Sequence, residues 1–395
     1  MWPFNSKKKL DPYLKTLSKL TTRTKLPVLI AYKGDIKKIK TKIRNLGGTV
    51  THEYSLTSTL AANILLTSIE KIGTLPEVKS LYYDHKAVLC IHKASKALCI
   101  DVSKSSNITG RDVTIGIVDS GIYPHKGLTQ KQNTIKYFTD ILNGGNKPYD
   151  DHGHGTYLGG IIASNFDYAQ GIAPDSSLCV AKAFDQTGYG TLSNILKGIE
   201  DIYKETPDMQ ILLLPFEVRE MPELRVNPLY NTIKHLYENN VTIISPSGNN
   251  GPNAFSISQP GSYREVITVG GCFMSDDNFK ICNYSSRGPL KVDYTKPDVI
   301  SICEGITSLK SDTLHKPKSR LLEKESIGTS SFCGTSVSSA LIAGMCALII
   351  ERYGNLPPKD IKSILSLGTK SIGENKNIQG KGIVMLDKIL KEKDK

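Results

Sequence analysis

The chain has 395 residues, of which 39% are hydrophobic and 22% are charged. This is the composition of an ordinary globular protein, and the length is enough for more than one small domain. Residues 1–45 hold 13 Lys/Arg and 2 Asp/Glu and so carry +11 of the net charge of +12, which leaves a near-neutral body and excludes the basic surface typical of a nucleic-acid-binding enzyme.

Residues 1–25 form a basic N-terminal extension. They contain no apolar segment that predicts a signal peptide, and no run of 18 apolar residues predicts a transmembrane helix. We therefore expect a cytoplasmic protein, or one exported by a route without a recognisable signal peptide. Leucines at helical spacing within residues 7–20 predict a helix that docks on the domain behind it or, as the less common outcome, one that contacts a membrane surface. These leucines are Leu10, Leu14, Leu17 and Leu20.

Residues 26–95 predict a small α+β domain. A β-type run at 27–32 precedes a helical stripe at 36–46, two more β-type runs, a short helix around 67–74 and a last strand at 78–83. The order strand, helix, strand, strand, helix, strand is a split βαβ plan.

Residues 96–390 predict a larger α/β domain. Its β-type runs are almost continuously apolar, which is typical of parallel strands that are buried on both faces. Helical stripes at 192–202, 229–237 and 337–350 separate or follow these runs. We therefore expect an open, mostly parallel sheet with helices on both faces. The runs span residues 113–118, 178–184, 211–216, 241–245 and 266–270.

Three segments far apart in this domain carry residues that suit nucleophilic catalysis. Asp119 ends a predicted strand and precedes Ser-Gly, His154 lies in Gly-His-Gly-Thr, and Ser336 lies in Gly-Thr-Ser-Val-Ser. A hydroxyl is a poor nucleophile at neutral pH unless an imidazole takes its proton and a carboxylate holds that imidazole in the right tautomer. The three segments together therefore predict a serine nucleophile, a histidine base and an orienting aspartate.

Each segment also has a simpler interpretation. An Asp-Ser-Gly turn and a serine at the start of a helix are common without any catalytic role. His152 and His154 have the spacing of a His-x-His chelate, but no third ligand follows at a suitable distance. We therefore predict no metal site, and the joint occurrence of the three segments favours catalysis.

A fourth segment, Gly248-Asn249, follows the predicted strand at 241–245. An asparagine amide at a strand end can donate a hydrogen bond to an oxygen that becomes negative during the reaction. Without the other three segments, a Gly/Asn-rich turn would be the better interpretation.

With these motifs the chain resembles the subtilisin-like serine proteases, most closely the intracellular bacterial branch with an N-terminal inhibitor-like propeptide. The motifs are Asp119-Ser-Gly, His154-Gly-Thr, Gly248-Asn249 and Gly334-Thr-Ser336. The resemblance implies that Ser336 is the nucleophile, His154 the base and acid, and Asp119 the orienting group. It also implies that Asn249 and the Ser336 N–H form the oxyanion hole. Two positions, Tyr157 and Ala340, stand where the family usually has His and Pro.

The resemblance also implies how the chain is used. Residues 26–95 would be a propeptide that assists folding and then inhibits the catalytic domain at 96–390. The expected function is a serine endopeptidase made as a zymogen, which forms an acyl-enzyme, processes itself and cuts protein or peptide substrates. The chemistry requires no cofactor, and calcium is a possible structural ion without assigned ligands. The alternative is a catalytically weak or inactive protease-like protein that acts as a binding or regulatory partner.

The substrate strand departs most from the family pattern. Members usually have Ser-Leu-Gly where this chain has Pro-Phe216-Glu217. We expect Phe216, Glu217 and Gly248 to contact substrate, with Phe216 as an apolar pocket wall. A carboxylate at Glu217 would favour a basic residue before the cut, which makes Lys93 and Lys96 candidate self-cleavage points. The competing prediction is that Glu217 faces solvent or partly blocks the pocket.

The eight cysteines form no Cys-x-x-Cys pair, and no Cys/His group has zinc-finger spacing. Several lie within apolar runs, so we expect buried, reduced thiols. That usage agrees with a reducing compartment.

Overall fold

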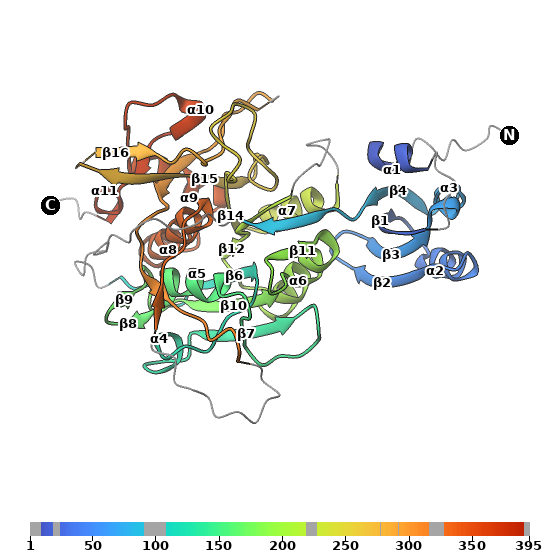
Figure 1. The fold of residues 1–395 in the computed structure, drawn as a ribbon, viewed down its shortest axis with the longest axis horizontal. Coiled ribbons are helices and arrows are strands. Elements are labelled where there is room, and N and C mark those ends of the chain that lie inside the picture. The colour runs from blue at the N-terminus through green and yellow to red at the C-terminus, as the bar shows by residue number, and fades with distance from the viewer. Residues whose placement is uncertain are drawn as a thin grey trace.

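The computed structural model describes residues 9–18, 24–90, 108–218, 227–276, 278–290, 292–315 and 328–390. These residues form a small N-terminal unit and a much larger C-terminal one (Figure 1). The first described helix, α1 (Pro12–Leu17), lies on the side of the small unit, and the last, α11 (Leu386–Leu390), lies on the far side of the large unit.

The small unit is a four-stranded antiparallel sheet with two helices, in the order β2-β3-β1-β4. This order confirms the predicted split βαβ plan, in which each helix connects two strands that are not neighbours. Its core is built from the apolar faces of the sheet and of α2. The elements are β1 (Lys25–Tyr32), α2 (Ile36–Asn45), β2 (Thr49–Tyr54), β3 (Thr59–Leu65), the 3-10 turn η2 (Leu66–Ser68), α3 (Ile69–Gly73) and β4 (Val78–Tyr83).

The leucine stripe of the basic extension packs on the small unit. Helix α1 (Pro12–Leu17) is capped by Asp11, whose Oδ1 accepts the Leu14 N–H at 2.7 Å and whose Oδ2 accepts the Tyr83 N–H at 2.6 Å. Leu10 and Leu14 are buried in the core of the small unit. The described part of the stripe therefore follows the docking alternative, and Leu20 lies outside the described residues.

The large unit contains an open sheet in the order β20-β21-β17-β15-β14-β12-β6-β10-β7, and β16 pairs with β15. Neighbouring strands from β21 to β7 run parallel, whereas β20 and β16 pair antiparallel with their partners. The predicted open, mostly parallel sheet is confirmed. Its strands are β6 (Thr114–Asp119), β7 (Ile135–Asp140), β10 (Ser177–Lys182), β12 (Ile211–Leu213), β14 (Thr242–Pro246), β15 (Val266–Ser275), β16 (Asn278–Ile281), β17 (Val299–Ile302), β20 (Thr369–Lys370) and β21 (Ile383–Val384).

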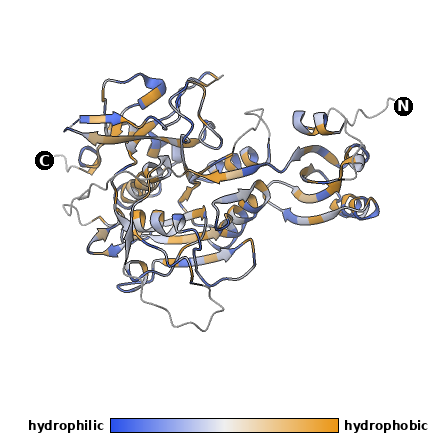
Figure 2. Ribbon diagram, in the orientation of Figure 1, coloured by the Kyte–Doolittle hydropathy of each residue, from blue (hydrophilic) through white to orange (hydrophobic). Residues whose placement is uncertain are grey.

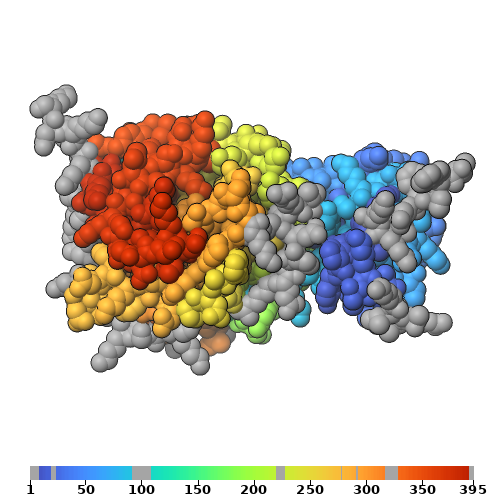
Figure 3. All heavy atoms as spheres, turned by 90° about the horizontal axis from the view of Figure 1, so that it is seen from above, coloured from blue at the N-terminus to red at the C-terminus, as the bar shows by residue number. Residues whose placement is uncertain are grey.

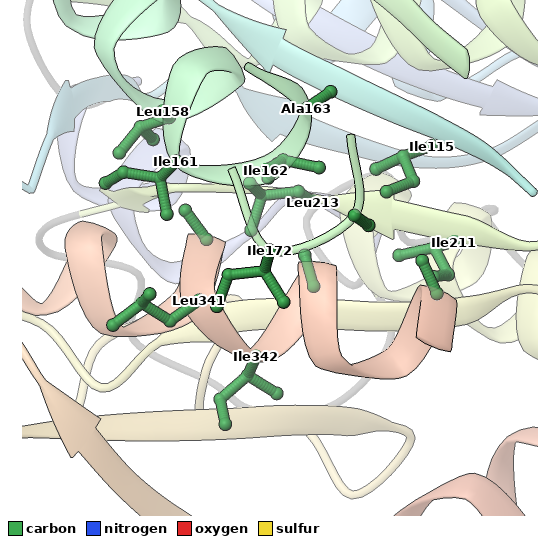
Figure 4. Close-up of a cluster of buried hydrophobic side chains, with 14 of the residues drawn as sticks. Ile115, Leu158, Ile161, Ile162, Ala163, Ile172, Ile211, Leu213, Leu341 and Ile342 are labelled. Carbon is green, nitrogen blue, oxygen red and sulfur yellow. The ribbon is translucent and has the colours of Figure 1, made fainter. Parts of the chain in front are cut away.

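Both faces of this sheet are covered because its central strands are apolar on both sides. Ile115 and Ile117 belong to the core beneath α5 (His154–Ala163) and α8 (Thr335–Tyr353), as Figure 4 shows for part of this cluster. Val118, one residue later, belongs to the opposite core, with α6 (Leu192–Glu205) and α7 (Pro228–Glu238). This alternation follows from the two-residue period of a strand.

Helix α8 runs through the middle of the large unit, where Figure 2 shows mainly hydrophobic ribbon. Every residue from Thr335 to Ile350 is buried. Among the described residues it is the one helix long and apolar enough to cross a membrane by length and composition, and 89% of its apolar window is buried inside the protein. Its apolar surface is therefore accounted for by core packing.

A three-stranded antiparallel sheet joins the two units. Strand β5 (Lys86–Leu89), which leaves the small unit, lies between β11 (Tyr189–Thr191) and β13 (Phe216–Val218) of the large unit. In the space-filling view the small unit is seated at one end of the large one (Figure 3). The remaining elements are α4 (Lys126–Thr129), β8 (Asn165–Phe166), β9 (Ala169–Gln170), β18 (Ser308–Leu309), β19 (Thr329–Ser330), α9 (Pro358–Leu367), α10 (Lys376–Gln379) and α11 (Leu386–Leu390).

Candidate active site

Three predicted site residues meet where one strand ends and two helices begin. Asp119 is the last residue of β6, His154 is the first residue of α5, and Ser336 is the second residue of α8. The two helices pack against each other on one face of the sheet, which brings their first turns to the carboxyl end of β6. Ends of parallel strands are where α/β folds place their ligands.

The three side chains form a continuous hydrogen-bonded row. The His154 Nδ1 lies 2.9 Å from Asp119 Oδ1 and 2.8 Å from Oδ2, and its Nε2 lies 2.9 Å from the Ser336 Oγ. Asp119 and His154 are fully buried, and Ser336 is 1% exposed. With the carboxylate on the Nδ1 side, the proton of a neutral imidazole sits on Nδ1 and leaves Nε2 free to accept the serine proton.

Asp150, which the sequence analysis did not single out, holds the surroundings of this row. Its Oδ1 accepts from the Ser120 hydroxyl at 2.9 Å and from the N–H groups of His152 and Gly153 at 3.1 and 2.7 Å. Its Oδ2 accepts from the Thr156 N–H at 2.9 Å and the Thr156 hydroxyl at 2.7 Å. One buried carboxylate therefore ties the turn after β6 to the first turn of α5.

A buried lysine supports the same turn from the neighbouring strand. Lys182 is the last residue of β10 and is fully buried. Its Nζ donates to the Ser120 carbonyl at 2.6 Å, to the Phe184 carbonyl at 3.0 Å and to Asp151 Oδ1 at 2.6 Å. A lysine inside the apolar run at 178–184 is the sequence signal for this role, because a buried charge requires a partner.

Asn249 lies in the loop after β14 and faces the first turn of α8. Its Oδ1 accepts from the Thr335 N–H at 3.1 Å and from the Thr335 hydroxyl at 2.9 Å. This fixes the amide orientation and turns the Nδ2 group the other way. Within the described part of the chain this buried Nδ2 has no hydrogen-bond partner. A buried donor without an acceptor has the property required of an oxyanion-hole group before the reaction.

The chain of the small unit enters this site as an extended strand. Ala87, Val88 and Leu89 in β5 lie opposite Val218, Glu217 and Phe216 in β13. The Cys90 N–H donates to the Pro215 carbonyl at 3.3 Å, and the Leu89 N–H donates to the Gly188 carbonyl at 3.1 Å. Residues 87–90 are therefore held by main-chain hydrogen bonds from both sides, which is how an extended peptide is recognised regardless of its sequence.

The carbonyl of Cys90 reaches the serine. The Ser336 Oγ lies 2.8 Å from the Cys90 oxygen, so this hydroxyl has both that carbonyl and the imidazole within reach. A Cβ on Gly334 would lie 2.2 Å from the Cys90 oxygen and 3.2 Å from Asn249 Nδ2. Glycine at this position, with a φ of +144°, thus permits the close approach of the carbonyl to the first turn of α8.

The predicted substrate-contact residues divide between the two faces of the three-stranded sheet. Phe216 is buried in one core with Leu89 and Phe184, and the centroids of the two Phe rings are 5.3 Å apart. Glu217 faces the other way and is 2% exposed, so the solvent-facing alternative is wrong. Its Oε2 packs near Gly248, where an added Cβ would lie 2.9 Å from it.

Tyr157 replaces the usual second histidine without leaving polar groups unpaired. Its hydroxyl donates to the Ile306 carbonyl at 2.7 Å and lies 3.3 Å from the Phe332 carbonyl. Burial raises the pKa of Tyr157 above its ordinary value, so the hydroxyl remains a donor near neutral pH. The hydroxyl therefore connects α5 to the segments before α8.

All seven cysteines that the structure describes are free and buried. Two of them, Cys282 and Cys303, have their Sγ atoms 2.7 Å apart, and together with Glu304 they form the one cluster of three potential ligand side chains found in the described residues. Calcium takes six to eight oxygen ligands. The two thiols do not suit that ion, so this cluster does not supply ligands for a structural calcium.

A parallel α/β sheet with an Asp-His-Ser row at its strand ends is the arrangement of a serine hydrolase. The family model described as Peptidase_S8, subtilase family, matches residues 110–382. The serine protease AprX of Bacillus subtilis is 33% identical over 302 residues, which cover 72% of this chain and 67% of AprX. This chain therefore belongs to the subtilase family and is a serine protease.

Two further comparisons agree with this assignment. The minor extracellular protease Epr of Bacillus subtilis is 28% identical over 49% of this chain, which spans 28% of Epr. The crystal structure of fervidolysin from Fervidobacterium pennivorans, a keratinolytic enzyme related to subtilisin, superposes with a TM-score of 0.74 at 16% identity. That match covers 93% of this chain and 61% of fervidolysin, and at this identity it establishes the shared fold.

Proposed function

We propose that this protein is a serine endopeptidase made as a zymogen and that its first substrate is the peptide bond after Cys90 in its own chain. The observation that carries the proposal is the position of the Cys90 carbonyl, whose oxygen lies 2.8 Å from the Ser336 Oγ. Main-chain hydrogen bonds hold this carbonyl in place, as they would hold the carbonyl of any bound peptide.

The chemistry follows from the row of side chains. The Ser336 Oγ attacks the Cys90 carbonyl carbon while its proton passes to His154 Nε2. Asp119 holds the imidazole and stabilises its positive charge, and Asn249 Nδ2 donates to the oxygen that becomes negative. The C–N bond breaks when His154 protonates the leaving amine, which leaves an acyl-enzyme. Water, activated by the same imidazole, then hydrolyses the ester and restores Ser336.

The small unit has the contacts expected of a propeptide that remains bound. The Tyr54 hydroxyl donates to the Ser193 carbonyl at 2.9 Å, and Asp84 Oδ1 accepts the Ser193 N–H at 2.9 Å. The N–H and hydroxyl of Ser55 donate to Glu200 Oε1 at 2.9 and 2.6 Å. These bonds hold the small unit on α6 independently of β5, so the small unit would stay bound after the bond is cut until it is removed.

This proposal places the cut away from the lysines considered in the sequence analysis. Lys93 and Lys96 lie outside the described residues, whereas the carbonyl that reaches Ser336 belongs to Cys90. The alternative of an inactive binding protein has no support in the geometry of the row, because its three side chains are within hydrogen-bonding distance of one another.

The test is the intact mass of three purified full-length proteins: wild type, Ser336→Ala and Ser338→Ala. Ser338 lies on the same helix and is also buried, but its hydroxyl donates to the Ser301 carbonyl at 3.1 Å, so it is the matched control. We expect wild type and Ser338→Ala to lose residues 1–90 and Ser336→Ala to stay whole. Wild type that stays whole and does not react with a serine-directed fluorophosphonate would refute the proposal.

A further inference from the structure

We propose that the Glu217 carboxylate fills the pocket beneath the residue before the cut, so that this protease cleaves after small side chains. The inference rests on the proposed function, because it takes Cys90 as that residue. Glu217 can influence specificity in two ways: its charge would attract a basic side chain, and its volume would exclude large side chains.

The pairing of β13 with β5 sets the direction of the Glu217 side chain. Glu217 lies opposite Val88 in the antiparallel pair of β13 and β5, and residues directly opposite each other project to the same face of a sheet. Cys90 is two residues beyond Val88, so its side chain shares that face. Leu89 and its partner Phe216 occupy the other face, where both belong to one apolar core. Glu217 and Cys90 therefore project to the same side of the bound strand.

The Glu217 carboxylate is held by hydrogen bonds from the loop that contains Asn249. Glu217 Oε2 accepts from the Asn250 Nδ2 at 2.7 Å, the Ser258 hydroxyl at 3.0 Å and the Asn249 N–H at 3.3 Å. Asn249 is the residue whose Oδ1 accepts from Thr335, immediately before the nucleophile. The carboxylate is thus anchored in the loop that lines the reacting carbonyl on the face that carries the Cys90 side chain.

The space around the Glu217 carboxylate is closely packed. A Cβ added at Gly248 would lie 2.6 Å from the Ser258 Oγ and 2.9 Å from the Glu217 Oε2, so the carboxylate packs directly against backbone. Glu217 is 2% exposed and Cys90 is 1% exposed. A glycine at position 217 would leave the volume of the whole side chain open beneath the strand.

The volume of the Glu217 side chain, and not its charge, therefore decides which side chains fit before the cut. A lysine or an aromatic side chain before the cut would have to displace a carboxylate that already accepts from three donors. Buried polar groups that lose their partners are a stronger source of discrimination than added apolar contact. Small side chains such as those of Cys, Ala and Ser avoid this conflict, and the residue that the chain itself presents, Cys90, is one of them.

The experiment uses the self-cleaved protein after its N-terminal fragment has been separated from it, together with peptides that contain Lys-Ala-Val-Leu-X, where X is Ala, Ser, Cys, Leu, Phe or Lys. Wild type is compared with Glu217→Gly, which empties the pocket, and with Glu217→Gln, which keeps the shape and removes the charge. Fluorophosphonate labelling counts active sites, so that kcat/KM refers to folded, reactive enzyme in each case.

We expect wild type to prefer small X over Phe and Lys by at least roughly tenfold in kcat/KM. Glu217→Gly should reverse the preference between Ala and Phe, and Glu217→Gln should keep the wild-type order. A wild-type preference for Lys that Gln abolishes would overturn the inference in favour of charge, and an unchanged order in Glu217→Gly would overturn it outright. Folded wild type that fails to label would instead refute the proposed function on which the inference depends.

Discussion

Replacing Asp150 by Asn tests whether this buried carboxylate organises the active site. The wild-type carboxylate accepts five hydrogen bonds, from Ser120, His152 and Gly153 on one oxygen and twice from Thr156 on the other. An asparagine oxygen can replace the first oxygen, but its NH₂ group then faces the Thr156 N–H, which loses its acceptor. The Thr156 hydroxyl can rotate to accept instead.

The expected loss of stability in Asp150→Asn is set by the hydrogen bonds that the substitution weakens or removes. A hydrogen bond to a charged group contributes about 1.5–3 kcal/mol, and a buried donor left without an acceptor costs about 1–3 kcal/mol. Asp150→Asn leaves one such donor and removes the charge from the remaining bonds. We therefore expect the free energy of unfolding to fall by about 3–5 kcal/mol.

The pH dependence has a definite sign. Burial alone would raise the pKa of Asp150, but hydrogen bonds from Gly153, Thr156 and Ser120 hold the pKa below its ordinary value. The folded state therefore binds the proton less readily than the unfolded state. This stabilisation is complete above the ordinary aspartate pKa of about 3.9 and is lost as the pH falls below it toward the folded-state pKa. Because asparagine does not titrate, the free energy of unfolding of Asp150→Asn should lack the part of its decrease at acidic pH that protonation of Asp150 causes.

The assay is guanidinium unfolding between pH 3 and 7, with every variant made in the Ser336→Ala protein so that self-cleavage does not interfere. Asp167→Asn is the matched control because Asp167 is exposed, and it should change stability by less than about 0.5 kcal/mol. If the free energies of unfolding of Asp150→Asn and Asp167→Asn differ by less than about 1 kcal/mol, the organising role of Asp150 is wrong. The same conclusion holds if the two free energies fall equally steeply as the pH is lowered.

Asn249→Ala should lower kcat by about 10²–10³-fold with little change in KM, which is the size of the loss when this donor is removed from the related subtilisin. Peptide hydrolysis normalised to the number of labelled active sites checks this prediction. A fall in kcat of less than about tenfold would contradict it. Gly121→Ala should lower the free energy of unfolding by roughly 2–4 kcal/mol, because the new Cβ would lie 2.1 Å from the Tyr149 carbonyl oxygen at a φ of +120°. Gly34→Ala is the control, because Gly34 has open space around it, and it should lower the free energy of unfolding by only about 1 kcal/mol. Equal melting temperatures for the two glycine variants would argue against the steric explanation. Tyr157→Phe removes one buried hydrogen bond and should lower the free energy of unfolding by about 0.5–1.5 kcal/mol. Its kcat should stay within about twofold of the wild-type value. A large fall in kcat would instead show that Tyr157 takes part in the reaction.

Local pattern was sufficient for the fold and for the row of site residues. Asp119, His154 and Ser336 could be found because each lies in a short motif at a strand end or helix start, and the parallel sheet brings such ends together. The apolar runs predicted the central strands because a strand that is buried on both faces is recognised by continuous apolar sequence alone. The split βαβ plan of the small unit was predicted from a different signal, the order of its β-type runs and helical patterns along the chain.

The tertiary structure alone decided what occupies the site and what supports it. Cys90 meets Ser336 through pairing of β5 with two strands that are distant in sequence, and main-chain hydrogen bonds leave no residue signature. The direction of Glu217 depends on strand register, in which one residue of uncertainty reverses the face. Asp150 and Lys182 act through backbone groups of a turn whose position only the folded sheet defines. Sequence thus determined the chemistry available, and long-range packing determined where each group acts.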